Sequence, residues 1–181
     1  MKPNIPVHTR YPLGSVFTYN GLTIVHFILG GAGIIVAYHS WLGYLLGPAY
    51  VVFAFIEMYV LMPLKVCPNC PYSTLDNSLC ISGMNIMSKR FARKGNITDF
   101  GNRAKGTFCP NNLYIGSLTF PIIILIPALL FAFSFGLLAI WLGLIGLLLF
   151  RFFVVFPKIA CVHCRAKNIC PNAKAMGLSA K

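Results

Sequence analysis

Residues 63–70 read PLKVCPNC, and residues 157–164 read PKIACVHC. Both stretches have the form P-x-x-x-C-x-x-C, they lie 94 positions apart, and each follows a long run of apolar residues. They decide the fold because they divide the chain into two hydrophobic blocks that end in the same pair of thiols. We interpret the correspondence as an internal repeat, in which a membrane hairpin and its Cys-x-x-Cys turn are duplicated.

The two apolar blocks are too poor in charge for soluble helices. Of the 181 residues, 57% are hydrophobic and 10% are charged, whereas a typical soluble domain has about 25% charged residues. Residues 22–64 contain one formal charge, Glu57, and residues 113–157 contain one, Arg151. A bilayer span needs about 20 apolar residues, so each block can cross twice. The sequence predicts an all-α integral membrane protein with four transmembrane helices in two repeated hairpins and a small Cys-rich metal-binding cap.

The chain divides into five segments by composition. They are a polar N-terminal segment (1–20), hairpin 1 (21–64), a basic Cys-containing segment (65–112), hairpin 2 (113–157) and a Cys-rich tail (158–181).

Local patterns predict two further features. Gly43, Gly47 and Pro48 indicate the turn of hairpin 1, between helices over about 21–41 and 48–64. Residues 78–95 predict an amphipathic helix that lies at the membrane surface, since Cys80, Met84, Met87 and Phe91 recur at helical spacing among basic residues.

The net charge of +12 serves as a topology signal. Lys and Arg concentrate between the two blocks and after the second, whereas the short connections inside each block contain neither. By the positive-inside tendency, we expect both termini and the central segment to be cytoplasmic. We expect this face to contact membrane lipid and a protein partner subunit, and we expect no binding of nucleic acid.

An even number of crossings separates the two Cys-x-x-Cys motifs, so both emerge on the same membrane face. Four thiolates from Cys67, Cys70, Cys161 and Cys164 suit a tetrahedral zinc or iron ion. The remaining cysteines allow another division, in which Cys67, Cys70, Cys80 and Cys109 hold one iron–sulfur cluster while Cys161, Cys164 and Cys170 contribute to a second. The sequence leaves Zn²⁺ and an iron–sulfur cluster open.

Intramembrane polar residues are candidates for a second site. Glu57 and Arg151 are also 94 positions apart, and because charges at this depth normally have partners, we predict an ion pair between them. His26 and His39, both in the first helix, are candidate quinone or haem contacts. Haem needs ligands from facing helices, and the other predicted helices contain no histidine, so haem would require a partner subunit.

These features predict the membrane metal-thiolate subunit of a redox complex, which links a cytoplasmic partner to a membrane carrier such as quinone. One alternative is a non-catalytic scaffold with a structural zinc site made of four cysteines. Another is a quinone-linked thiol–disulfide oxidoreductase, since Cys-x-x-Cys pairs also carry that chemistry. One Glu and two Asp in the whole chain leave little for acid–base hydrolysis, so the sequence does not decide whether the protein is an enzyme.

Overall fold

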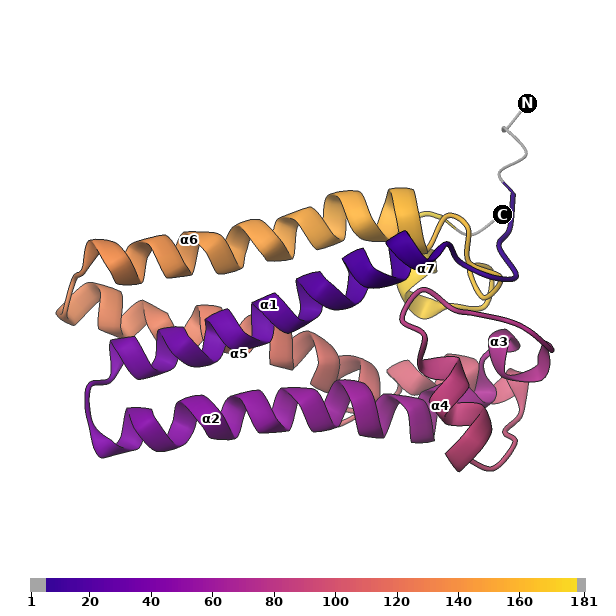
Figure 1. Ribbon diagram of the computed structural model, residues 1–181, viewed down its shortest axis with the longest axis horizontal. Helices are drawn as coiled ribbons and strands as arrows, with labels where there is room; N and C mark the ends of the chain where they lie inside the picture. The colour runs from indigo at the N-terminus through magenta and orange to yellow at the C-terminus, as the bar shows by residue number, and fades with distance from the viewer. Residues whose placement is uncertain (1–5, 179–181) are drawn as a thin grey trace.

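Four long apolar helices form the body of the molecule, and the cysteine-bearing loops gather at one end of it (Figure 1). The computed structural model describes residues 6–178; residues 1–5 of the predicted N-terminal segment and 179–181 of the tail lie outside this range. The apolar helices are Leu13–Ala37, Trp41–Asn69, Pro110–Phe131 and Phe135–Ala160. Each is long enough to cross a bilayer, so the prediction of an all-α protein with four helices able to span a membrane is confirmed.

The elements are, in chain order, α1 (Leu13–Ala37), α2 (Trp41–Ile56), the π-helix η1 (Glu57–Val66), the 3₁₀ turn η2 (Cys67–Asn69), α3 (Pro71–Thr74), α4 (Met84–Phe91), the 3₁₀ helix η3 (Ile97–Ala104), α5 (Pro110–Phe131), α6 (Phe135–Phe150), the π-helix η4 (Arg151–Ala160) and α7 (Pro171–Ala175). The starts of α2 and α6 lie 94 positions apart, and so do those of η1 and η4. The origin of this correspondence in a duplicated hairpin stays a prediction.

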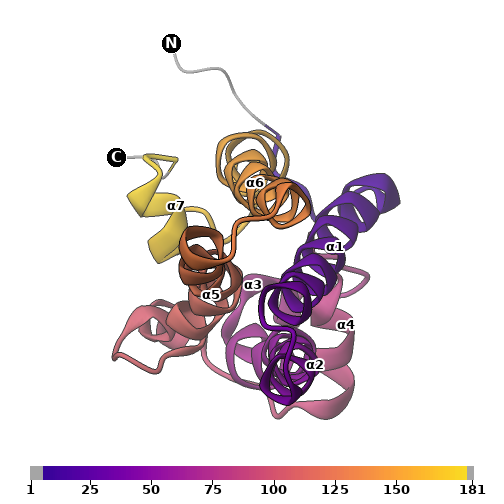
Figure 2. The same cartoon turned by 90° about the vertical axis from the view of Figure 1, so that its left-hand side faces the viewer.

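Viewed along the bundle, α1 lies beside both α2 and α6, and α5 lies beside α6 (Figure 2). Small residues allow α1 and α2 to pack backbone against backbone. A Cβ at Gly47 would lie 2.8 Å from the Gly31 carbonyl oxygen, and one at Gly31 would lie 2.3 Å from a Val51 methyl group. Glycine is therefore required at this crossing, as is common where membrane helices approach closely.

Hairpin 1 differs from its predicted bounds. Helix α1 begins at Leu13, so it includes much of the segment that the sequence assigned to a polar N-terminus. The predicted turn at residues 43–48 is wrong, because the turn lies at 38–40 and Pro48 is inside α2. Proline has a backbone φ that suits a helix, and a transmembrane helix tolerates it when neighbours compensate for the lost hydrogen bond.

Helix α5 shows such compensation. Pro121 has no N–H group, so the carbonyl of Ser117 four residues earlier lacks its usual helical donor. The Tyr50 hydroxyl of α2 donates to this carbonyl at 2.8 Å. A Cβ at Gly30 of α1 would lie 2.9 Å from both Pro121 and Tyr50, so a glycine at this position lets three helices meet.

The predicted surface helix is shorter than expected. Only Met84–Phe91 is helical, and Cys80 lies before it. Met84 is buried, but Met87 and Phe91 are 45% and 66% exposed, so the four residues do not share one packed face. The reason is local: Gly83 adopts a left-handed backbone conformation and starts the helix after Cys80 rather than before it.

Candidate functional site

A cavity of about 170 Å³, which we call the cysteine cavity, lies at the end of the bundle that carries the Cys-x-x-Cys turns. Six cysteines line it, three from each half of the chain: Cys67, Cys70, Cys80, Cys161, Cys164 and Cys170. Apolar side chains and two tyrosines of the bundle, Tyr19 and Tyr114, complete the inner wall. The structure thus brings both motifs to one place, as the even number of crossings predicts.

Proline and a change of helical register deliver each motif to the cavity. Both η1 and η4 contain a proline, Pro63 and Pro157. At the end of η1 the Cys67 N–H donates to the Met62 carbonyl, five residues earlier. A register of i→i+5 lets a helix continue past a residue without an N–H group, and such π-helical turns occur frequently at functional sites.

The second motif has the same backbone pattern. The Cys161 N–H donates to the Phe156 carbonyl at 2.7 Å, again across five residues. The Cys164 N–H then donates to the Cys161 carbonyl at 3.2 Å, and the equivalent bond from Cys70 to Cys67 is 3.0 Å. Each pair is therefore held in a tight turn, so the two thiols of a pair lie on neighbouring parts of the cavity wall.

Cys80 is positioned by a buried amide. The Cys80 N–H donates to the side-chain oxygen of Asn85 at 3.0 Å, and the Asn85 amide nitrogen donates to the Ser78 carbonyl at 2.9 Å. Asn85 is 1% exposed. A buried amide with both ends bonded fixes loop geometry well, and this one holds the loop of residues 78–85 against the cavity.

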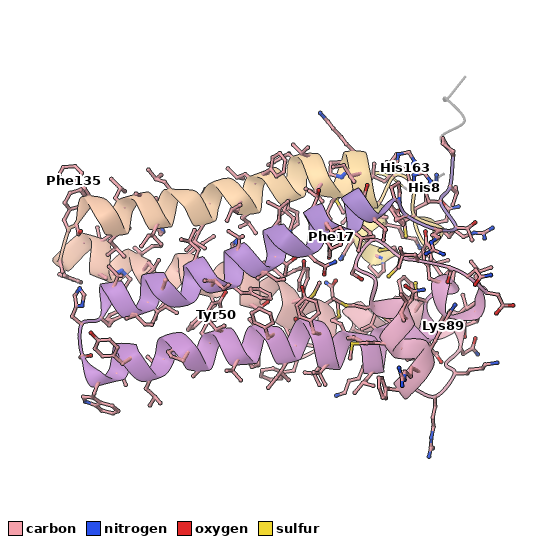
Figure 3. All side chains as sticks on the ribbon, in the orientation of Figure 1. His8, Phe17, Tyr50, Lys89, Phe135 and His163 are labelled. Atoms are coloured by element: carbon pink, nitrogen blue, oxygen red, sulfur yellow. The ribbon has the colours of Figure 1, made fainter. Side chains whose placement is uncertain are left out.

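The segment of residues 6–11, which we call the N-terminal strap, lies beside the cavity and contributes Tyr11 to its lining. The His8 N–H donates to the His163 carbonyl at 2.9 Å, while Tyr11 and Thr9 exchange backbone hydrogen bonds with Leu79 at 2.9 and 3.2 Å. The rings of His8 and His163 stack with centroids 4.6 Å apart, at the end of the bundle opposite Phe135 (Figure 3). The strap thereby ties the Cys80 loop to the second Cys-x-x-Cys turn.

Two tyrosines anchor the strap from inside. The Tyr11 hydroxyl donates to the Ala160 carbonyl, and the Tyr72 hydroxyl donates to the His8 carbonyl at 2.7 Å. Burial raises the pKa of both phenols, and negative charge on Cys164 raises each pKa further. Both tyrosines therefore stay neutral hydrogen-bond donors beside the thiols.

Cys109 differs from the other six cysteines in its position. Among the described residues it is the one cysteine that does not line the cavity. It is the N-cap of α5, where its sulfur accepts a hydrogen bond from the Asn112 N–H at 3.4 Å. The division that grouped Cys109 with Cys67, Cys70 and Cys80 therefore does not match this arrangement.

Glu57 and Arg151 are both buried, but they do not form the predicted ion pair. The Arg151 guanidinium donates to the Tyr114 hydroxyl at 2.7 Å, to the Tyr19 carbonyl at 3.3 Å and to the Thr23 hydroxyl. Within residues 6–178, neither carboxylate oxygen of Glu57 has a hydrogen-bond partner. The prediction failed because hydroxyl and carbonyl groups of α1 and α5 reach the guanidinium and take the place of a carboxylate.

The two histidines of α1 and its turn have different surroundings. His26 is buried, and its Nε2 lies 2.9 Å from the Leu118 carbonyl of α5, so it links two helices in the bundle core. His39 is exposed in the turn after α1, at the end far from the cysteines. The structure therefore gives neither residue a place in the cavity, and a quinone or haem contact at either stays untested.

Sequence reasoning missed the tyrosines and Asn85. Tyr11 stands in the polar N-terminal segment, and Tyr72 stands in the four-residue helix α3, so neither belongs to a periodic sequence pattern. Their roles depend on contacts between positions 61–149 residues apart. No signal in a single sequence identifies such contacts.

Among the described residues, no three or more His, Cys, Asp or Glu side chains are close enough together to coordinate one metal ion. Six cysteines are instead among the residues that line a cavity of about 170 Å³. Comparison with family models, curated proteins and solved structures finds no match to the chain. The proposals below therefore depend on the cavity and its surroundings alone.

Proposed function

We propose that the protein is a membrane redox subunit that holds an iron–sulfur cluster in the cysteine cavity and passes electrons between a cytoplasmic protein and a lipid-phase carrier. The observation that supports this proposal is the lining of one cavity by six cysteines, three from each half of the chain. Thiolates are the usual ligands of such clusters, which take four.

The shape of the site favours a cluster over a single ion. A zinc ion needs four sulfurs at about 2.3 Å from one point, which leaves little space between them. The cysteine cavity has about 170 Å³, several times the space that one water molecule occupies. Ligands arranged around such a volume suit a group with several metal atoms better than one ion.

We assign the four ligands to Cys67, Cys70, Cys161 and Cys164, whose paired turns approach the cavity from the two long hairpins. When bound, the cluster would supply one-electron chemistry. Buried Met58 and Phe156 form the apolar wall toward the bundle, and Tyr11 of the strap contributes to the wall on the cap side.

The proposed topology places the cap in the cytoplasm. The described cap residues include Arg10, Lys65, Lys89, Arg93 and Lys158, which are exposed, and an excess of Lys and Arg is typical of cytoplasmic loops. A reducing compartment keeps thiols available for metal ligation. If the tail is cytoplasmic, a C-terminal fusion to green fluorescent protein should fluoresce and a C-terminal fusion to alkaline phosphatase should be inactive. A dark fluorescent-protein fusion together with an active phosphatase fusion would place the tail on the outer side.

The experiment that tests the function is anaerobic purification followed by measurement of iron, zinc, acid-labile sulfide and the visible and electron paramagnetic resonance spectra. We expect a brown protein with iron and sulfide in comparable amounts. Cys67→Ser and Cys161→Ser should each lose most of the iron, whereas Cys109→Ser, which changes a thiol outside the cavity, should retain it.

Two other outcomes would replace the proposal. A colourless protein with one zinc and no sulfide would identify the scaffold alternative. A metal-free protein whose Cys-x-x-Cys pairs cycle between thiol and disulfide would identify thiol–disulfide exchange. An equal loss of iron in Cys109→Ser and Cys67→Ser would contradict the assignment of ligands.

A further inference from the structure

A second pocket, of about 440 Å³, lies between α2 and α5. We call it the α2–α5 pocket. Its walls are apolar and aromatic, with Tyr50 and Phe53 from α2, Phe120 from α5 and Phe108 from the loop before α5. Its volume falls in the range of about 300–1,000 Å³ that small-molecule sites have. The pocket is therefore large enough for a ligand with an aromatic ring.

The pocket opens toward the membrane. Phe53 and Phe120 lie within two of the apolar spans and are 47% and 45% exposed. Side chains that are exposed at this height of the bundle face lipid rather than water. A ligand must therefore reach the pocket through the hydrocarbon phase, which excludes water-soluble metabolites.

One end of the pocket is polar. Thr107 and Asn112 lie there, next to the cap, and the Asn112 amide nitrogen donates to the Gly106 and Thr107 carbonyls at 3.2 and 3.4 Å. Phe108, which is 84% exposed, stands beside this end. The arrangement suits an amphipathic molecule whose polar ring lies near the cap and whose apolar tail extends along the helices.

A single helix separates this pocket from the cysteine cavity. In the first turns of α5, Asn111 and Tyr114 line the cysteine cavity, whereas Asn112, Leu113 and Gly116 line the α2–α5 pocket. A helix with its side chains is about 10–12 Å across. The two sites therefore lie on opposite faces of one helix, at the same level of the bundle.

We propose that the α2–α5 pocket binds a lipid-soluble quinone, which exchanges electrons with the centre held by the cysteines. This inference rests on the proposed function and names its lipid-phase substrate. Two electrons, delivered one at a time from a centre that a cytoplasmic one-electron donor protein re-reduces, and two protons from the aqueous side near Asn112 convert the quinone to the quinol. The reverse transfer follows the same route.

Gly116 offers a clean way to fill the pocket. A Cβ at Gly116 would meet no atom within 4 Å, and the same holds for Gly146 of α6. Both glycines are exposed within apolar helices. Gly116→Phe therefore adds a ring at the pocket wall from a Cβ position that is free of contacts, and Gly146→Phe makes the same change elsewhere on the lipid-facing surface.

The test uses an aryl-azide derivative of decylubiquinone in nanodiscs of phosphatidylcholine. We expect illumination to label peptides that line the pocket, from residues 46–53 or 107–120, and excess decylubiquinone to prevent labelling. Gly116→Phe should reduce labelling at least tenfold, and Gly146→Phe should leave it unchanged. Labelling that excess decylubiquinone does not displace, or that Gly146→Phe reduces equally, would show only nonspecific contact with lipid-phase molecules and overturn the inference.

Labelling does not require a metal centre, so its outcome is separate from that of the proposed function. With the centre reduced by dithionite, decylubiquinone should reoxidise it at least tenfold more slowly in Gly116→Phe than in Gly146→Phe. A protein that contains iron and sulfide but shows no displaceable labelling retains the proposed function and loses this inference. Specific labelling of a protein without a redox centre retains a quinone site and loses the function.

Discussion

The partners of Arg151 give a quantitative prediction about the bundle core. Its guanidinium donates to the Tyr114 hydroxyl at 2.7 Å, whereas the Glu57 oxygens accept no hydrogen bond in the described part of the chain. Tyr114→Phe removes the hydroxyl and leaves the ring, so it deletes the 3.3 Å bond between the Tyr114 and Tyr19 hydroxyls together with the stronger hydrogen bond to a charged group. Such bonds contribute about 1.5–3 kcal/mol, so we expect Tyr114→Phe to lower the free energy of unfolding by about 2 kcal/mol.

Two variants with smaller expected costs serve as references for this value. Tyr38→Phe removes a hydroxyl that donates to the Ile124 carbonyl at 2.7 Å, which is a bond between neutral groups and should contribute about 1 kcal/mol. Glu57→Gln keeps the size of the side chain and loses no hydrogen bond, so we expect a change below about 1 kcal/mol. Removal of one partner of a buried ion pair costs about 3–5 kcal/mol, and these values separate the two arrangements.

The assay is unfolding by sodium dodecyl sulfate in mixed micelles with dodecyl maltoside, followed by far-ultraviolet circular dichroism. The order expected is Tyr114→Phe most destabilised, then Tyr38→Phe, then Glu57→Gln. If Glu57→Gln proves the most destabilising of the three by about 2 kcal/mol or more, a direct ion pair with Arg151 exists and the reasoning from hydroxyl partners is wrong.

The packing of the bundle and the strap gives three more predictions. Gly31→Leu should separate α1 from α2 and lower the free energy of unfolding by more than about 2 kcal/mol, because its Cβ would lie 2.3 Å from a Val51 methyl group. Gly21→Leu, whose Cβ would meet no atom within 4 Å, should leave the free energy of unfolding unchanged in the same assay. Leu144→Ala, at a fully buried position, should lower the free energy of unfolding by about 2–5 kcal/mol. Leu142→Ala, at a position 54% exposed, should lower it by less than about 1 kcal/mol. Equal losses would contradict the burial pattern. Tyr11→Phe should loosen the strap and increase the rate of maleimide labelling of the cavity cysteines several-fold in metal-free protein, and an unchanged rate would show that the strap does not limit access.

The sequence predicts the membrane helices well because hydropathy reports directly on the cost of placing polar groups in lipid. It also places both cysteine turns at one end, since parity of crossings needs no knowledge of packing. It fails at the turn of hairpin 1, because Gly43, Gly47 and Pro48 lie inside helix α2. Gly47 is required because α1 packs closely against it. Glycine marks both turns and close helix contacts, so its presence in the sequence does not distinguish the two.

The hydrogen-bond partners of Arg151 could not be predicted from the sequence for a different reason. A spacing of 94 residues aligns Glu57 with Arg151 at the starts of η1 and η4, and opposite charges at matched positions suggest a pair. The choice between a carboxylate and a hydroxyl as partner depends on side chains from α1 and α5, which no alignment of the two halves contains.

Arg151 has hydrogen-bond partners and Glu57 has none among the described residues, and this difference has a chemical consequence for the cavity. Arg151 lies 5.2 Å from the ring centroid of Tyr19 and 5.9 Å from that of Tyr114, and both tyrosines line the cysteine cavity. A cation that is buried without a carboxylate partner keeps its full charge in a medium of low dielectric constant. In the proposed function, thiolates that bind a metal centre would bring negative charge into the same region. The fold therefore places a positive charge against two tyrosines of the cavity wall, and a direct pair between Arg151 and Glu57 would have cancelled it.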